Sequence, residues 1–135
     1  MGPDFYIVDV FAERTYAGNP LAVVLDAGRL GDDAMQQLAL ETNYSETTYV
    51  YGTPEADGGY RTRLFTPARE IAFAGHPILG TAWVIRKALC PDSQVVKLNL
   101  KVGQIPVVFE QFDGAEILWF DAPAVTPGAT CAPER

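Results

Sequence analysis

The chain has 135 residues, 48% of them hydrophobic, and a formal net charge of −7. This length and composition suit one globular domain with a hydrophobic core and argue against a disordered chain. The acidic balance argues against sequence-independent nucleic-acid binding, which depends on neutralising phosphates with basic side chains. The first residues lack the basic region and apolar core of a signal peptide, and no apolar stretch is long enough to span a membrane. We therefore expect a cytoplasmic protein.

The first half of the chain contains strand-like and helical patterns. A run of β-branched and aromatic residues at Phe5–Phe11 predicts a strand, and the turn "TYAGNP" separates it from a second strand at Leu21–Leu25. In "GDDAMQQLALETN" the apolar residues recur with helical spacing, and Asn43 is a suitable stop. Two further strands are predicted at Thr47–Tyr51 and Tyr60–Phe65.

The second half begins with an unusual helix. Residues Pro77–Leu89 are apolar on nearly every side until Arg86 and Lys87, which predicts a helix surrounded by other structure. Three more strands are predicted at Val95–Leu100, Gln104–Glu110 and Glu116–Phe120.

These elements predict an α+β domain over residues 1–120. A mostly antiparallel, barrel-like sheet would wrap around the apolar helix, because a helix of this kind must be buried. Residues 121–135 are rich in Pro, Ala and Gly and are interpreted as a tail or a truncated linker.

The single histidine, His76, stands in "AGHPILG" directly before Pro77. Proline is favoured in the first helical turn, so this spacing places His76 at or beside the N-cap. The open amides of a helix start favour an anion such as a substrate carboxylate, and they favour a neutral imidazole that donates a hydrogen bond or carries a proton. A capping histidine without chemistry is the alternative interpretation.

Glu46 is the second candidate, because "NYSETTYV" places it where a helix has ended and a strand begins. Partial burial at such a junction would let its carboxylate exchange a proton near neutral pH. The alternative is a solvated glutamate at the end of a strand. Ser45 beside it is either a hydrogen-bond donor to substrate or a turn former. Arg61 and Arg63 are interpreted as a solvated strand face.

The sequence offers little for metal or covalent chemistry. Cys90 and Cys131 are isolated thiols, too few for a disulfide framework, and one histidine with two cysteines lacks the spacing of a zinc site. Walker, GxSxG and GxGxxG motifs are absent. We expect no metal and no cofactor.

Four ordered segments resemble those of PhzF-like phenazine biosynthesis proteins. They are "VDVFAERTYAGNPLAVV", "MQQLALETNYSETTYV", "FTPAREIAFAGHPILGTAWV" and, more weakly, "ILWFDAPA". The resemblance covers about residues 5–123 and implies one half of a diaminopimelate epimerase-like fold. In that fold a β-barrel half surrounds a central helix, and two such halves face each other across the active-site cleft.

The resemblance also implies roles for four residues. Characterised members isomerise trans-2,3-dihydro-3-hydroxyanthranilate without a cofactor, so Glu46 would be the general acid/base and His76 would assist proton movement. Ser45, Gly75 and His76 would hold the substrate. Related epimerases and proline racemases carry a catalytic cysteine where this chain has Ala74, which argues against two-thiol racemisation.

Members of this family have a second half that supplies an aspartate and a small hydroxyl/glycine segment to the cleft. Nothing in residues 1–135 can replace that half, so we expect a homodimer or a second-half polypeptide to complete the site. The expected substrate is a small molecule with a carboxylate, and neither nucleic acid nor membrane is an expected partner. The alternative is a truncated, non-catalytic or partner-dependent binding domain that keeps the fold without the reaction.

Overall fold

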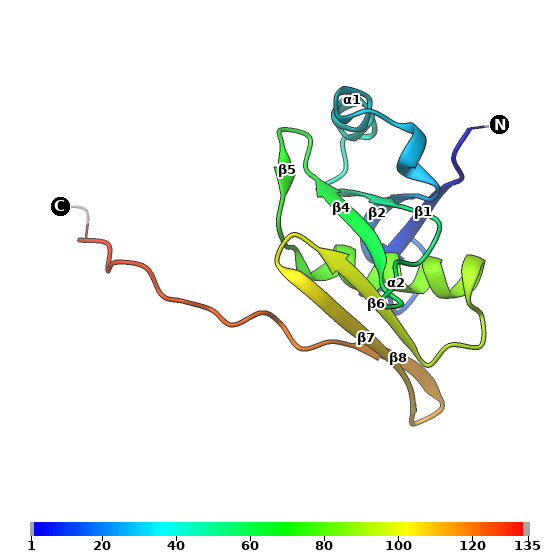
Figure 1. Cartoon of the computed structure of the whole chain (residues 1–135). Helices are drawn as coiled ribbons and strands as arrows, with labels where there is room; N and C mark the ends of the chain where they lie inside the picture. The colour runs from blue at the N-terminus through cyan, green and yellow to red at the C-terminus, as the bar shows by residue number, and fades with distance from the viewer. Residues whose placement is uncertain (1, 134–135) are drawn as a thin grey trace.

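The computed structural model describes residues 2–133, in which a single curled sheet carries two α-helices (Figure 1). The elements follow in chain order: β1 (Phe5–Val10), β2 (Asn19–Val24), a 3-10 turn η1 (Ala27–Arg29), α1 (Asp32–Thr42), β3 (Thr47–Val50), β4 (Tyr60–Phe65), β5 (Glu70–Ile71), α2 (Gly75–Leu89), β6 (Val95–Leu100), β7 (Gly103–Phe112) and β8 (Ala115–Trp119). The predicted α+β class is thereby confirmed.

The strands follow the order β1-β2-β3-β4-β6-β7-β8, and the short β5 pairs with β4. Two neighbouring pairs are parallel, β2 with β3 and β4 with β6, and the other pairs are antiparallel. The sheet is therefore mixed. Because α2 packs against β1 and β2 near one edge and against β6 and β7 near the other, the sheet curls into a half-barrel.

The two helices cover opposite faces of the sheet. Side chains alternate between faces along a strand, and neighbouring residues of β2 and β3 belong to different cores. Val23 and Val50 belong to the core beside α2, whereas Val24 and Tyr49 belong to a smaller core beside α1 that also contains Met35. In that smaller core the Tyr49 ring meets Phe65 edge-on, with centroids 5.2 Å apart.

The complete enclosure expected for the apolar helix is not found in the described residues. Ile78, Ala82 and Ile85 are fully buried, but Trp83 on the same helix keeps 36% of its surface exposed. Within residues 2–133 the sheet ends at β1 and β8, which do not pair with each other, so α2 is covered only where strands reach it. A groove of about 840 Å³ lies in the gap, between residues of β1, α2 and β8.

Several boundaries differ from those predicted. Strand β5 was missed because two residues are too short to show a periodic pattern. Helix α2 begins two residues earlier than predicted, at Gly75, and Asn43 ends α1 in the left-handed conformation as expected. Residues 120–133 contain no helix or strand and run away from the sheet as an extended segment (Figure 1).

Candidate functional site

The fold brings Glu46 and His76 together from segments 30 residues apart. Glu46 Oε2 lies 3.4 Å from His76 Nε2, and the side chains are only 16% and 15% exposed. Both atoms are buried, and within residues 2–133 neither makes a hydrogen bond. Buried polar atoms of native proteins are nearly always hydrogen-bonded, and exceptions concentrate at sites of function.

Glu46 is aimed by the end of α1 and the start of β3. Asn43 adopts φ 55°, its N–H donates to Ala39 O at 3.2 Å, and the chain then turns into β3 at Thr47. Glu46 lies two residues before Thr48, so the two share a face of the strand, the face that meets α2. This alternation explains why the carboxylate reaches the helix start instead of solvent.

His76 is the second residue of α2, and the cap is Ala74, which makes no side-chain hydrogen bond. The interpretation of His76 as a capping residue is therefore wrong. The first amides of a helix have no partner within it, and Pro77 has no N–H to contribute. The imidazole thus stands beside open N–H groups that favour an anion.

Ser45 and Gly75 are the chain neighbours of this pair. Ser45 is exposed, and no hydrogen bond of its hydroxyl is found among residues 2–133. A Cβ added to Gly75 would meet no atom within 4 Å, so open space lies beside the helix start. The glycine keeps that space free next to His76.

A buried hydrogen bond joins the two elements that carry the pair. The hydroxyl oxygens of Thr48 on β3 and Thr81 on α2 are 2.7 Å apart, and both residues are fully buried. Sequence reasoning missed this contact because threonine is common in strands and helices alike, and no spacing signals a pair 33 positions apart.

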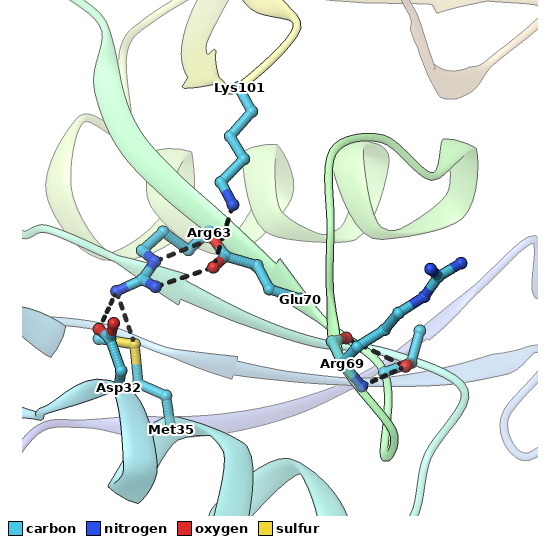
Figure 2. Close-up of polar contacts among 7 residues, drawn as sticks. Asp32, Met35, Arg63, Arg69, Glu70 and Lys101 are labelled. Carbon is cyan, nitrogen blue, oxygen red and sulfur yellow. Dashed lines mark hydrogen bonds and ion pairs between the residues drawn. The ribbon is translucent and has the colours of Figure 1, made fainter.

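On the opposite face of the sheet, Arg63 is the centre of a charged cluster (Figure 2). Its guanidinium donates to both carboxylate oxygens of Glu70 and to Asp32, and Lys101 also reaches Glu70. The Arg63 side chain is only 16% exposed, so its interpretation as part of a solvated face is wrong. Hydrogen bonds from Arg63 hold the pKa of Glu70 below its ordinary value of 4.5. Arg61, in contrast, is exposed and stacks over Tyr51.

Neither metal ligation nor a membrane span is indicated by the part of the chain described. No three His, Cys, Asp or Glu side chains among residues 2–133 gather closely enough to hold a metal ion. In the same range, no helix is both long and apolar enough to cross a membrane. Cys90 and Cys131 are free thiols.

Comparison with known proteins shows which family this chain resembles. A model of phenazine biosynthesis-like proteins, PhzC-PhzF, matches residues 8–134. The trans-2,3-dihydro-3-hydroxyanthranilate isomerase of Pseudomonas aeruginosa is 41% identical over 110 residues, which cover 82% of this chain and 38% of that enzyme. The chain thus spans about two fifths of the length of this relative.

Solved structures agree at the level of the fold. A Bacillus anthracis phenazine biosynthesis protein of the PhzF family matches with a TM-score of 0.77 and 28% identity, over 89% of this chain and 40% of that one. A hydroxyproline epimerase from Agrobacterium vitis matches with a TM-score of 0.53 over 80% of this chain and 38% of that one. At 14% identity this second likeness concerns the fold alone, and it agrees with the epimerase-like fold expected from the sequence. The chain belongs to the PhzC-PhzF family of phenazine biosynthesis-like proteins.

Proposed function

We propose that this chain provides the proton-transfer half of a cofactor-independent isomerase acting on a small substrate with a carboxylate. Trans-2,3-dihydro-3-hydroxyanthranilate, after which the Pseudomonas aeruginosa relative is named, is the model substrate. The observation that carries the proposal is the buried Glu46–His76 pair: Glu46 Oε2 and His76 Nε2 are 3.4 Å apart, and within residues 2–133 neither atom makes a hydrogen bond.

In the proposed reaction Glu46 is the general acid/base. Its carboxylate takes a proton from one carbon of the substrate and returns it to another, so the glutamate ends as it began. His76, beside the carboxylate, holds the substrate and assists the proton movement. The open amides at the start of α2 bind the substrate carboxylate, and the free space beside Gly75 admits it.

We infer that a second structural half, from a partner copy of this chain or from polypeptide outside these 135 residues, supplies the other wall of the cleft. This chain covers 38% of the length of the Pseudomonas aeruginosa isomerase. The open edges β1 and β8 and the exposed side of α2 would be covered further in such an assembly, which would complete the enclosure of the helix. The expected cytoplasmic location stays a prediction.

The alternative is a binding domain without catalysis. Large apolar side chains on β1, α2 and β8 are exposed and could serve a partner: Phe5, Ile7, Trp83, Ile117 and Trp119. Such a domain would bind its partner without exchanging any substrate proton, so the two functions differ in a measurable property.

Deuterium incorporation from D₂O into trans-2,3-dihydro-3-hydroxyanthranilate tests the proposal. The chain is assayed alone at several concentrations and together with the C-terminal part of the Pseudomonas aeruginosa relative, while light scattering reports its assembly state. We expect exchange in at least one assembly and a loss of about 10²- to 10⁴-fold in Glu46→Gln. Glu41→Gln, on the exposed face of α1, is the matched control and should exchange normally. Absence of exchange in every assembly would leave the binding domain as the function.

A further inference from the structure

The distance between Glu46 and His76 depends on how α2 lies along β3. Glu46 precedes β3, and His76 is in the first turn of α2, so a small slide of the helix along the strand would separate them. Apolar contacts are non-directional, so they define the register of a helix less narrowly than a hydrogen bond does. A directional contact between the same two elements would fix the register.

Thr48 and Thr81 form a contact of this kind. Their Oγ1 atoms are 2.7 Å apart, and both residues have no exposed surface. A hydrogen bond between hydroxyls is confined to a narrow range of distance and angle, so it restricts both sliding and rotation of the helix.

The bond lies at matched distances from the site along both elements. Thr48 is two residues beyond Glu46, which corresponds to about 7 Å along a strand. Thr81 is five residues beyond His76, which corresponds to about 7.5 Å along a helix. The strand and the helix therefore run from the Glu46–His76 pair to the hydroxyl pair over nearly equal lengths.

Stability alone gives a weak reason for hydroxyls at these positions. Apolar side chains such as Val50, Ala82 and Ile85 form the hydrophobic core beside α2. Replacing both partners of a buried hydrogen bond by apolar groups of the same shape is nearly neutral for stability, and valine has the shape of threonine. The hydroxyl pair adds orientation, which two valines would not provide.

We propose that Thr48 and Thr81 are positioning residues that fix the register of α2 on β3 and thereby hold Glu46 Oε2 beside His76 Nε2. The inference deepens the proposed function and rests on it for its catalytic consequence. Its structural consequence is a change in the environment of the His76 ring when the hydroxyl pair is removed. This change can be measured without any substrate.

The test compares Thr48→Val, Thr81→Val, the double valine variant and Thr48→Ser, which keeps the hydroxyl. Thr62→Val is the matched control, since Thr62 is 3% exposed and its hydroxyl donates to Tyr60 O, on β4. Each variant is measured by thermal unfolding, by deuterium exchange into the substrate, and by the ¹H–¹³C signal of the imidazole across pH. The chain has one histidine, so this signal needs no assignment.

Each single valine variant should lower the melting temperature, and the double variant should recover most of that loss because no hydroxyl is left unpaired. Positioning predicts that the double variant still shows a displaced His76 signal and a kcat lowered about tenfold to hundredfold, with KM nearly unchanged. Thr48→Ser should keep the wild-type signal, and Thr62→Val should change neither the signal nor kcat.

A double variant whose His76 signal matches the wild type would overturn the inference and reduce the pair to a stabilising contact. If the wild type itself exchanges no deuterium, the proposed function fails, whereas the His76 signal still decides the positioning role. If a single variant does not fold, the double variant, which contains no unpaired hydroxyl, provides the comparison.

Discussion

Arg63 donates two nearly parallel hydrogen bonds to Glu70, from Nε to Oε1 at 3.0 Å and from Nη2 to Oε2 at 2.8 Å. The pair ties β4 to the short strand β5, and Arg63 Nη1 continues to Asp32 at the start of α1, 2.7 Å away. Gln36 of α1 also donates to the carbonyl oxygens of Thr66 and Pro67. The segment between β4 and His76 pairs with the sheet through only two residues of β5. Side-chain hydrogen bonds from Arg63 and Gln36 therefore attach this segment to β4 and α1.

The first prediction concerns the stability of this link. Glu70→Gln should lower the free energy of unfolding by about 1.5–3 kcal/mol, which is the range for a hydrogen bond to a charged group. The substitution removes the negative charge and replaces one carboxylate oxygen, and Arg63 and Lys101 both contact the same oxygen, Oε2. Urea denaturation at pH 7 measures the change. Glu116→Gln is the control, since Glu116 pairs with Arg86 but is more exposed, and it should lose less than about 1 kcal/mol.

The second prediction concerns acid. The hydrogen bonds from Arg63 depress the pKa of Glu70 below its ordinary value of 4.5. A depressed pKa stabilises the fold above the unfolded-state pKa, and the contribution is lost as the pH falls through the folded-state pKa. The difference in unfolding free energy between wild type and Glu70→Gln should therefore shrink below pH 4.5. A difference that stays constant down to pH 3 would contradict this assignment.

The third prediction concerns Tyr49, whose hydroxyl donates to Met35 O at 2.5 Å. Burial raises its pKa from 10.0 to about 12, so the neutral phenol stabilises the fold. This contribution is complete below pH 10 and is lost as the pH rises toward 12, by about 1.4 kcal/mol per pH unit. Tyr49→Phe should be about 1 kcal/mol less stable than wild type at pH 7, and this deficit should shrink above pH 10.

Chemical denaturation of both proteins between pH 7 and 11 measures that deficit. Tyr16→Phe is the control, because Tyr16 is 95% exposed, and its curve should follow the wild type. Parallel curves for wild type and Tyr49→Phe above pH 10 would show that the Tyr49 phenol is not the titrating group.

The fourth prediction separates stability from function at two glycines of α2. A Cβ at Gly75 meets no atom within 4 Å, so Gly75→Ala should fold with unchanged or slightly higher stability. The added methyl group would enter the space proposed for the substrate, so KM should rise. A Cβ at Gly80 would lie 2.7 Å from side-chain atoms of Leu21 and Val10, so Gly80→Ala should lose about 1–3 kcal/mol through overpacking.

Thermal unfolding and substrate titration of the two variants test this contrast. An unchanged KM in Gly75→Ala would exclude the space beside Gly75 as part of the substrate site. A Gly80→Ala variant as stable as wild type would show that Leu21 and Val10 adjust without strain.

Local patterns in the sequence predicted most elements because their periodicities are local. Val95–Leu100 was predicted with its observed bounds, and the left-handed stop at Asn43 also follows from the sequence. The "DG" dipeptide at 113–114 is typical of tight hairpin turns, and φ is 49° at Asp113 and 78° at Gly114. The sequence also predicted Glu46 and His76 as candidates, since each stands at a junction between elements.

Only the tertiary structure decided which residues meet. The approach of Glu46 to His76, the hydroxyl bond between Thr48 and Thr81 and the burial of Arg63 all join segments distant in sequence. The identity of a side chain does not reveal which distant residue it will contact, because that contact depends on sheet order and strand register. The apolar pattern of α2 likewise predicted that the helix is buried, but it could not predict where the sheet ends. In the described residues β1 and β8 are the two edges of the sheet and do not pair with each other, and Trp83 stays partly exposed.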